Sequence, residues 1–432
     1  MAVTRRDFLA LATGLGAAAG LAACGGGGGG STGTGESYTG RKVELTFWNG
    51  FTGGDGPVMR KLVEQFNSEH DNITVKMTVY EWAAYYEKLP TAVSSGKAPD
   101  IAIMHVDSLA TNAARGVILP LDDLAKTLKL TKDDFADTVW AAGEYQGKRY
   151  GIPLDVHPLG FYYNKTLMER AGLDPDNPPQ TADDYMAALE ALKAKDIQGM
   201  WMSPHLFTGV FVFHSLLWQF GGDLFNDDVT APTFAEEPGV KALTWMVDLV
   251  RNGYSPKNVG QDADSTAFQN NKNAFIWNGI WAINQYREVK GLEWGVAPLP
   301  QIGTEKAAWA GSHQFVLPKQ LKPDNDKIAA SKVFVNWISQ HSLDWAKGGQ
   351  VPARKSVRES DDFAALTEQA AIGEQVSYLH FPPPVPGIGD ALGPLNTAVN
   401  EAVLLKKEPA AALEKAAQDS AKILEENAKK YG

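Results

Sequence analysis

Tryptophans that stand beside small and polar residues recur along the chain, and they suggest a binding chemistry. An indole offers a flat apolar face, whereas a neighbouring amide, carboxylate or imidazole offers hydrogen bonds. Sugars need this combination, because their C–H faces lie on aromatic rings and their hydroxyls require fixed partners. The alternative is that these tryptophans are core residues, although the glycines around them indicate exposed turns. The four clusters are Trp48-Asn49-Gly50, Trp218-Gln219-Phe220-Gly221-Gly222-Asp223, Trp277-Asn278-Gly279-Ile280-Trp281 and Trp309-Ala310-Gly311-Ser312-His313.

Motifs of common enzymes are missing from the sequence. It contains no G-x-S-x-G nucleophile elbow, no H-E-x-x-H zinc motif and no P-loop. The eight histidines are scattered and no two are spaced i, i+4, so we expect no metal site and no cofactor. We therefore expect a protein that is not an enzyme. Glycoside hydrolysis by Asp107 and Asp223 remains a remote alternative, because its two carboxylates pair in space rather than along the chain.

The elements that must position these residues begin as alternating strands and helices. Apolar and β-branched runs predict strands over 43–48, 73–80 and 101–104, and helical spacing predicts helices over 57–69 and 85–93. This order predicts an open α/β sheet with mostly parallel strands. Ligands bind beyond the carboxyl ends of such strands. Those ends carry Trp48-Asn49-Gly50, Glu81-Trp82 and His105-Val106-Asp107.

The remainder of the chain shows further strands and helices without an internal repeat. Residues 150–155 resemble a strand, and Thr181 with Asp184 forms a capping box for a helix through Lys195. Other helical patterns cover 165–170, 211–220, 239–252 and 409–430, and a helix-to-strand stretch covers 280–297.

Composition limits the classes of partner. The chain has 432 residues, which predicts two to four domains, and 44% hydrophobic with 21% charged residues is an ordinary globular balance. The formal net charge of −11 disfavours nucleic acid as a partner. The single cysteine, Cys24, leaves no pair for a disulfide or a C-x-x-C site.

The N-terminus resembles an export signal of a bacterial lipoprotein. Arg5 and Arg6 precede an apolar stretch that ends at Ala23 and is too short for a spanning helix, which is typical of a twin-arginine signal. Small residues precede Cys24, the position that receives the lipid in lipoproteins. We expect residues 1–23 to be the signal peptide and residues 24–40 to be the lipidated cysteine with a flexible linker rich in Gly, Ser and Thr.

Taken together, short segments in order resemble family 1 extracellular solute-binding proteins of bacterial ABC importers, the sugar receptors similar to maltose-binding protein. The similarity covers essentially all of the chain after the linker. The segments are Leu45-Thr46-Phe47-Trp48-Asn49-Gly50, Leu62-Val63-Glu64-Gln65-Phe66-Asn67, Gly96-Lys97-Ala98-Pro99-Asp100-Ile101-Ala102, Gly151-Ile152-Pro153, Tyr163-Asn164-Lys165, Gly221-Gly222-Asp223, Trp277-Asn278-Gly279-Ile280-Trp281, Val296-Ala297-Pro298-Leu299-Pro300 and Val351-Pro352-Ala353-Arg354.

The resemblance implies a two-lobed periplasmic-binding-protein fold of class II type, with the ligand in a cleft between the lobes. It places residues 41–155 and 312–349 in the first lobe, and residues 156–311 and 350–432 in the second lobe. Three chain crossings at the hinge would lie near Asp155, near Ala310 and near Gly348–Gly349. The implied ligand-binding residues are Trp48, Asn49, Glu81, Asp107, Asp155, His157, Trp218, Gly222, Asp223, Trp277, Trp281, Trp309, Gly311, His313 and Arg354.

The leading hypothesis is therefore an extracytoplasmic, lipid-anchored monomer that captures a mono- or oligosaccharide by lobe closure and delivers it to a membrane permease. The alternative is the same fold with a glycerophosphodiester or polyol ligand. A phosphate group would need cationic or backbone N–H donors, and Arg354 and His313 are the basic residues that we expect near the cleft.

Overall fold

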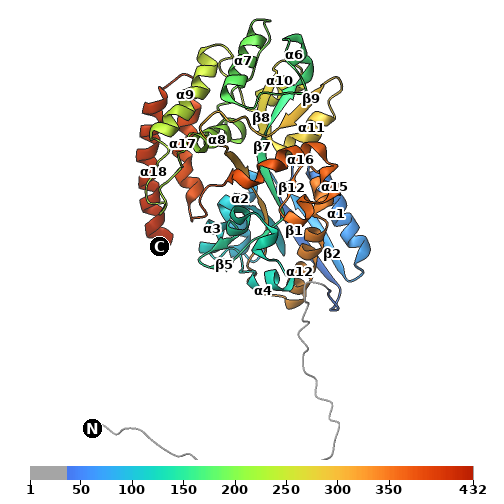
Figure 1. Cartoon of the computed structure of the whole chain (residues 1–432). Helices are drawn as coiled ribbons and strands as arrows, with labels where there is room; N and C mark the ends of the chain where they lie inside the picture. The colour runs from blue at the N-terminus through green and yellow to red at the C-terminus, as the bar shows by residue number, and fades with distance from the viewer. Residues whose placement is uncertain (1–36, 432) are drawn as a thin grey trace, which may run out of the picture. The chain divides into compact units, whose positions relative to one another are not determined.

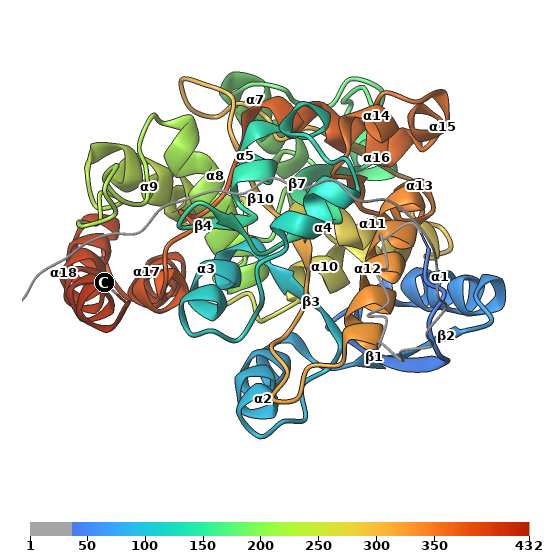
Figure 2. The same cartoon turned by 90° about the horizontal axis from the view of Figure 1, so that it is seen from below.

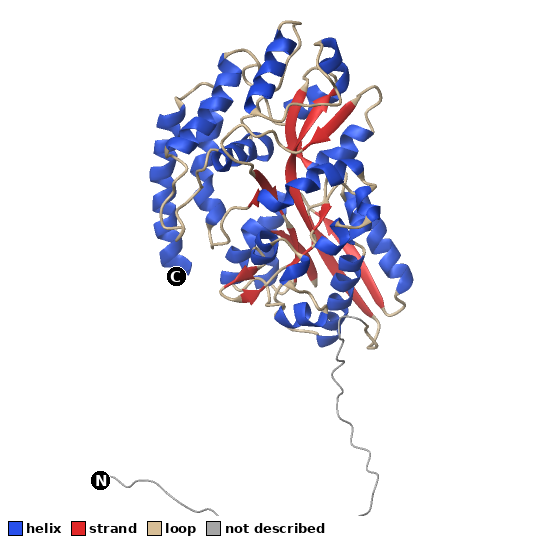
Figure 3. Ribbon diagram, in the orientation of Figure 1, coloured by secondary structure: helices blue, strands red, loops and turns tan. Residues whose placement is uncertain are grey.

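The computed structural model describes residues 37–431, so the expected signal peptide, Cys24 and most of the linker lie outside the described residues. The fold is built around two main sheets, flanked by helices (Figures 1 and 3). In the first sheet, β1 (Val43–Asn49), β2 (Ile73–Val79) and β3 (Ile101–His105) are parallel, with β1 between the other two. This arrangement confirms the order of strands predicted from the sequence.

Two short strands from later in the chain complete the first sheet. β11 (His313–Val316) pairs antiparallel with β3 on one side and with β6 (Ile152–Pro153) on the other. The register places His313 opposite His105. The strand β3 is buried along Ile101, Ala102, Ile103 and Met104, as expected for a central strand with both faces covered.

Helices cover the first sheet on both faces (Figure 2). In α1 (Gly56–Glu69), Met59, Leu62, Val63 and Phe66 are spaced to form one buried face. The Phe66 ring packs edge-on against Phe334 of α12 (Asn325–Gln340). The other elements of this region are α2 (Trp82–Ser94), α3 (Val106–Ala114), α4 (Asp122–Thr127), η1 (Lys132–Asp134), α5 (Asp137–Ala141), α13 (Ser342–Ala346) and the hairpin of β4 (Glu144–Tyr145) and β5 (Lys148–Arg149).

The second sheet is organised around one long strand, β7 (Asp155–Asn164), whose ten residues are all buried. Every partner of β7 is antiparallel to it, so the partners share one direction and β7 is the reversed strand. The partners are β12 (Val351–Pro352), β10 (Ala308–Gly311), β8 (Phe275–Gly279) and β9 (Trp294–Ala297), and β13 (Leu379–His380) pairs parallel with β10. The second sheet is therefore mixed rather than mostly parallel as expected: the four pairs that include β7 are antiparallel, and the pair of β10 with β13 is parallel.

Helices pack around the second sheet, and α9 (Glu237–Arg251), α17 (Ile388–Val403) and α18 (Pro409–Tyr431) lie side by side (Figures 1 and 2). The capping box predicted for α7 (Ala182–Lys193) is confirmed: the Asp184 N–H donates to Thr181 Oγ1, and the Thr181 N–H donates to the Asp184 carboxylate. The remaining elements are α6 (Lys165–Arg170), η2 (Leu206–Val210), α8 (Phe211–Gln219), α10 (Ala263–Gln269), η3 (Ile280–Ala282), α11 (Ile283–Arg287), α14 (Lys355–Arg358), α15 (Asp361–Ala364), α16 (Thr367–Gly373) and η4 (Glu374–Tyr378).

The chain passes between the two sheets three times. It leaves the first sheet between β6 and β7, returns between β10 and β11, and leaves again between α13 and β12. Separate hydrophobic cores lie under the two sheets, one containing Phe47, Phe315 and Phe334 and the other containing Phe161, Phe213 and Phe275. The fold is a two-lobed α/β fold of the class predicted from the sequence. Within residues 37–431, no helix combines the length and apolar character that crossing a membrane requires.

Candidate functional site

Three imidazoles meet where the chain passes between the sheets. His105 ends β3, His313 begins β11, and His157 is the third residue of β7. The ring centroids are 4.2 Å apart for His157 and His313, 4.8 Å for His105 and His313, and 5.5 Å for His105 and His157. Sheet pairing creates this cluster, because the antiparallel ladder sets His313 opposite His105, and β10 brings Gly311 opposite His157.

Asp155 is the hydrogen-bond centre of the junction and is fully buried. Its Oδ1 accepts from His157 Nδ1 at 3.1 Å and from the His313 backbone N–H at 3.0 Å. Its Oδ2 accepts from His313 Nδ1 at 2.8 Å and from Trp345 Nε1 at 2.7 Å. The carboxylate therefore joins β7 of the second sheet to β11 and α13, and it fixes the orientation of two of the three imidazoles.

The protonation states follow from these contacts and from burial. Burial alone would raise the pKa of Asp155, but the charge of His313 and the hydrogen bonds from His157 and His313 outweigh it and hold that pKa well below its ordinary value. Burial lowers the pKa of His157 to about 4, and it lowers the pKa of His105 well below its ordinary value. Near neutral pH, Asp155 is thus ionised while His105 and His157 are neutral.

Aromatic rings surround the three imidazoles. Trp82 lies 4.2 Å from His105 and is stacked on His313 at 5.7 Å between ring centroids. Trp281 and Trp309 lie 6.1 Å and 6.3 Å from His157. The rings come from both lobes. Trp82 belongs to α2 of the first lobe, whereas Trp281 belongs to η3 and Trp309 to β10 of the second lobe. The junction therefore combines flat apolar faces with polar nitrogen atoms.

Trp309 is held between neighbours and has one unused donor. Its ring stacks on Phe211 at 3.6 Å and 7°, and its backbone N–H donates to Ser215 Oγ of α8 at 2.9 Å. The Trp309 Nε1 is buried and has no hydrogen-bond partner in the described part of the chain. The Asn49 Nδ2, at the end of β1, is likewise unpaired among residues 37–431, while Asn49 Oδ1 accepts from the Phe51 N–H. Such buried donors are positions that a bound polar ligand would satisfy.

Glycine is required at position 311 for steric reasons. A Cβ at Gly311 would lie 2.1 Å from His157 Nε2. Any side chain there would displace the imidazole, because real Cβ atoms do not approach other atoms so closely. Gly311 therefore leaves room in the junction for the His157 ring.

The structure brings together Asp155, His157, Trp281, Trp309, Gly311 and His313 of the residues expected at the site. Trp277 is instead a core residue, 1% exposed, whose ring meets Tyr185 and Trp245. It was expected to stack on a ligand, but Trp277 lies in β8 opposite Phe161 of β7 and packs in the apolar core of the second lobe. Trp281 lies beyond the end of β8, in η3, so the strand does not place the two indoles on one face.

Three other expected residues, Trp218, Gly222 and Asp223, form a separate group after α8. Trp218 Nε1 donates to Asp223 Oδ1 at 3.0 Å, and its ring stacks on His380 at 5.0 Å, in the turn that contains Gly221 and Gly222 after α8. In this turn a Cβ at Gly222 would meet Leu217 and Pro238 at 2.7 Å.

Three further expected residues lie at the N-termini of helices. Glu81 is the exposed N-cap residue of α2, and Asp107 is exposed in the first turn of α3. Arg354 is the N-cap residue of α14, and its Nε donates to Ser339 Oγ at 3.2 Å. Burial lowers the pKa of Arg354, and the charge of Asp134 acts in the opposite direction.

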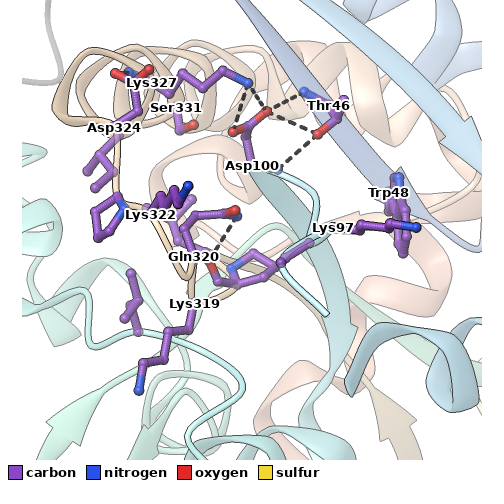
Figure 4. A pocket seen from close by; sticks show the side chains of 17 residues that line it. Thr46, Trp48, Lys97, Asp100, Lys319, Gln320, Lys322, Asp324, Lys327 and Ser331 are labelled. Carbon is purple, nitrogen blue, oxygen red and sulfur yellow. Dashed lines mark hydrogen bonds and ion pairs between the residues drawn. The ribbon is translucent and has the colours of Figure 1, made fainter. Parts of the chain in front are cut away.

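Trp48 lines a different hollow in the first lobe, with a volume of about 520 Å³ (Figure 4). This hollow lies at the start of β3, the end opposite His105, where Asp100 accepts from Lys327 Nζ and from Thr46. The Trp48 ring packs edge-on against Tyr80 at 5.0 Å. Trp48 was expected to contact ligand beside Asn49, but the alternation along β1 sends the two side chains to opposite faces.

Sequence reasoning missed several residues of the junction. His105 and Trp82 stand at strand ends that the sequence identified, yet neither was chosen as a site residue. Three more gave no signal: the Phe51 ring lies 5.0 Å from that of His313, Tyr86 Oη lies 2.8 Å from His105 Nδ1, and Trp345 donates to Asp155. The spacing of histidines along the chain gave no sign of this cluster, because His105, His157 and His313 come from three strands. Only the register of the antiparallel pairs brings them together.

Two α/β lobes joined by three chain passages, with aromatic rings and buried polar groups at the junction, define a two-lobed binding-protein fold. A family model for bacterial extracellular solute-binding proteins matches residues 61–371, and the chain belongs to this family.

Individual relatives and solved structures are similar over most of the chain. The maltodextrin-binding protein of Bacillus subtilis is 24% identical over 376 residues, which cover 84% of this chain and 86% of the relative. The GacH receptor of Streptomyces glaucescens, solved unliganded and in complex with acarbose, is similar with a TM-score of 0.79 and 23% identity, covering 89% of this chain and 99% of that chain. UgpB of Mycobacterium tuberculosis, solved with glycerophosphocholine, gives a TM-score of 0.77 and 19% identity over 89% of this chain and 99% of that chain.

Proposed function

We propose that this protein is the receptor of an ABC importer for a mono- or oligosaccharide, which it binds at the lobe junction and delivers to a membrane permease. The observation that carries this proposal is the junction itself, where Trp82, Trp281 and Trp309 surround buried polar groups. Indole faces suit sugar C–H faces, and the nitrogen atoms of His105, His157 and His313 suit hydroxyl groups. The names of relatives support the same class of ligand, since a maltodextrin-binding protein and an acarbose receptor share this fold.

The chain passages suggest how binding would be coupled to delivery. Leu154 and Ser312 are the single residues between β6 and β7 and between β10 and β11, so the lobes are joined there by very short segments. Rotation about such segments is a hinge closure, which encloses ligand between two rigid bodies. The expected monomer and the lipid on Cys24 complete the proposal: a tethered receptor whose closed form docks on its permease. The family places the protein outside the cytoplasm.

A glycerophosphodiester is the second candidate, favoured by the likeness to UgpB with glycerophosphocholine. Its phosphate would need a cationic group at the junction. Within residues 37–431, the hydrogen bonds and ring contacts found for His105, His157 and His313 include no lysine or arginine. Arg354 donates to Ser339 and interacts with the charge of Asp134. The contacts therefore favour the uncharged ligand.

A thermal-shift screen in the presence of a chelator tests the class of ligand. We expect one class of sugar to raise the melting temperature by several degrees, because ligand at about a thousand times its Kd adds about 4 kcal/mol to the free energy of unfolding. Glycerophosphodiesters and polyols serve as the comparison set. A shift with glycerophosphocholine and none with any sugar would contradict the carbohydrate proposal and support the second candidate.

The variant Trp281→Ala tests the location of the site. Loss of one stacking ring should weaken sugar affinity by about 5- to 150-fold, equivalent to about 1–3 kcal/mol. Trp281 is partly exposed, so its removal leaves the sheets intact. Isothermal titration with the sugar found in the screen measures the change, and an unchanged Kd would show that the ligand binds elsewhere.

A further inference from the structure

The three junction imidazoles are close enough to share one cation. One ring nitrogen from each of His105, His157 and His313 lies within 4.8 Å of one from each of the others. Nitrogen ligands at about 2.0–2.1 Å from a tetrahedral Zn²⁺ are about 3.3 Å apart, a difference that side-chain rotation can close. Imidazole is a preferred ligand of first-row transition metals such as zinc, copper and nickel.

The second nitrogen of each imidazole is already held by a neighbour. Asp155 accepts from Nδ1 of both His157 and His313, and Tyr86 Oη lies 2.8 Å from Nδ1 of His105. The Tyr86 oxygen also accepts from the His105 backbone N–H at 2.9 Å and has a lone pair left for Nδ1–H. Metal-binding histidines are commonly oriented in this way, with Nδ1–H on a carboxylate or another oxygen and Nε2 left for the metal.

The charges around the cluster favour a cation. Asp155 is fully buried, and the donors that bond to it are two imidazoles, an indole and a backbone N–H. A second buried carboxyl group, that of Asp55, accepts from Gln350 Nε2 through Oδ2 at 3.2 Å, and its Oδ1 has no hydrogen-bond partner in the described part of the chain. A buried carboxylate is expensive without a counter-charge, so a dication between these imidazoles would offset the charge of Asp155.

We propose that His105, His157 and His313 form a site for one divalent first-row transition-metal cation, with Asp155 and Tyr86 as positioning residues. The ligands come from both lobes, since His105 and His313 belong to the first sheet and His157 to the second. A bound cation would therefore hold the two lobes together beside the hinge. Three protein ligands leave a coordination position open toward the surrounding aromatic rings, as in zinc sites that accept a further ligand.

The test uses the tag-free protein after exhaustive treatment with a chelator. Zn²⁺ titration by calorimetry should show one cation bound per chain, and Co²⁺ should give the visible absorption bands of a tetrahedral nitrogen site. His105→Gln and His313→Gln should each weaken the affinity for Zn²⁺ by at least about 100-fold, and Tyr86→Phe by about 10-fold. His105 is only half-buried, so this variant remains informative if His313→Gln fails to fold.

The matched control is His341→Gln, because His341 lies at the end of α12, with Nδ1 bonded to the Trp337 carbonyl, and takes no part in the cluster. We expect it to bind Zn²⁺ as tightly as the unchanged protein. Absence of stoichiometric Zn²⁺ and Co²⁺ binding, or binding that His105→Gln and His313→Gln leave unchanged, would overturn the proposal.

The sugar screen in chelator separates the two hypotheses. A sugar response without metal binding refutes the metal site alone, and metal binding without a sugar response refutes the carbohydrate ligand alone.

Discussion

The two ends of strand β3 hold polar groups in contrasting surroundings. At its carboxyl end, His105 joins a buried cluster in which the donors to Asp155, among residues 37–431, are imidazole, indole and backbone groups. At its amino end, Asp100 accepts from Lys327 Nζ at 3.0 and 3.2 Å and from Thr46, beside an open hollow lined by further lysines (Figure 4).

The difference lies in which groups are already matched by a partner. At the amino end, the carboxylate beside the hollow of about 520 Å³ is paired with a lysine. The carboxyl end gathers aromatic faces, imidazoles and unpaired donors from both lobes. In sheets of this kind ligands bind beyond the carboxyl ends of the strands, and the side chains here agree with that rule.

Replacement of the two aspartates should give the largest contrast between these regions. Asp155→Asn turns an amide N–H₂ toward buried donors, so we expect the free energy of unfolding to fall by about 3–5 kcal/mol. Asp100→Asn should cost about 1–2 kcal/mol, because Lys327 is partly exposed and water can replace the lost contact. Urea denaturation of both variants measures the difference, and equal losses would contradict the central role that we assign to Asp155.

A buried imidazole outside the cluster should give an intermediate, pH-dependent effect. His214 on α8 lies among Phe211, Phe213 and Trp218, and burial lowers its pKa to about 3. Below about pH 6.5 the unfolded chain binds a proton that the folded protein excludes, so His214 makes stability fall as the pH drops toward 3.

The variant His214→Leu should remove this dependence. When the pH is lowered from 7 to 5, His214 should cost the unchanged protein about 2 kcal/mol of its free energy of unfolding, and the variant should not show this loss. Urea denaturation of both proteins at both pH values measures the difference. His341→Gln provides the comparison, since it replaces a histidine whose Nδ1 is bonded to a carbonyl. A pH dependence that His214→Leu leaves unchanged would show that His214 is protonated in the folded protein.

The smallest effect is expected at the lysine-lined end. Trp48→Ala should change sugar affinity less than about twofold, because the Trp48 ring packs on Tyr80 and lines the hollow at the start of β3. Isothermal titration beside Trp281→Ala compares the two ends directly. A tenfold loss of sugar affinity in Trp48→Ala would show that Trp48 contacts the ligand and would contradict the contrast between the two ends of β3.

Much of the fold could be predicted because it depends on local patterns. The strands β1, β2 and β3 and the helices α1, α7 and α18 follow from alternation, helical spacing and a capping box, and the two-lobed class follows from the ordered family segments. The reversed direction of β7 was not predicted, because strand direction depends on pairing between segments far apart in the sequence.

The junction was only partly predictable for the same reason. Asp155, His157 and His313 were chosen because they lie at expected chain crossings, and the structure places them together. Trp48 and Trp277 were chosen by residue type, but each lies on a strand face that points away from the junction. Trp48 lines the hollow at the start of β3, and Trp277 packs against Trp245. His105 was not chosen, since only the register of β11 against β3 reveals its proximity to His313.

The long strand β7 also has a consequence for the order of events during synthesis. Each partner strand that pairs along β7 lies far downstream, and Tyr162 of β7 donates to the Gly279 carbonyl across 117 residues. Residues 157–164 of β7 pair only after β8, β9 and β10 have emerged between residues 275 and 311, and Asp155 and Val156 wait for β12 at Val351–Pro352. Until β8 emerges, β7 lacks all of these partners, and long-range pairing of this kind folds slowly and exposes the nascent chain to aggregation.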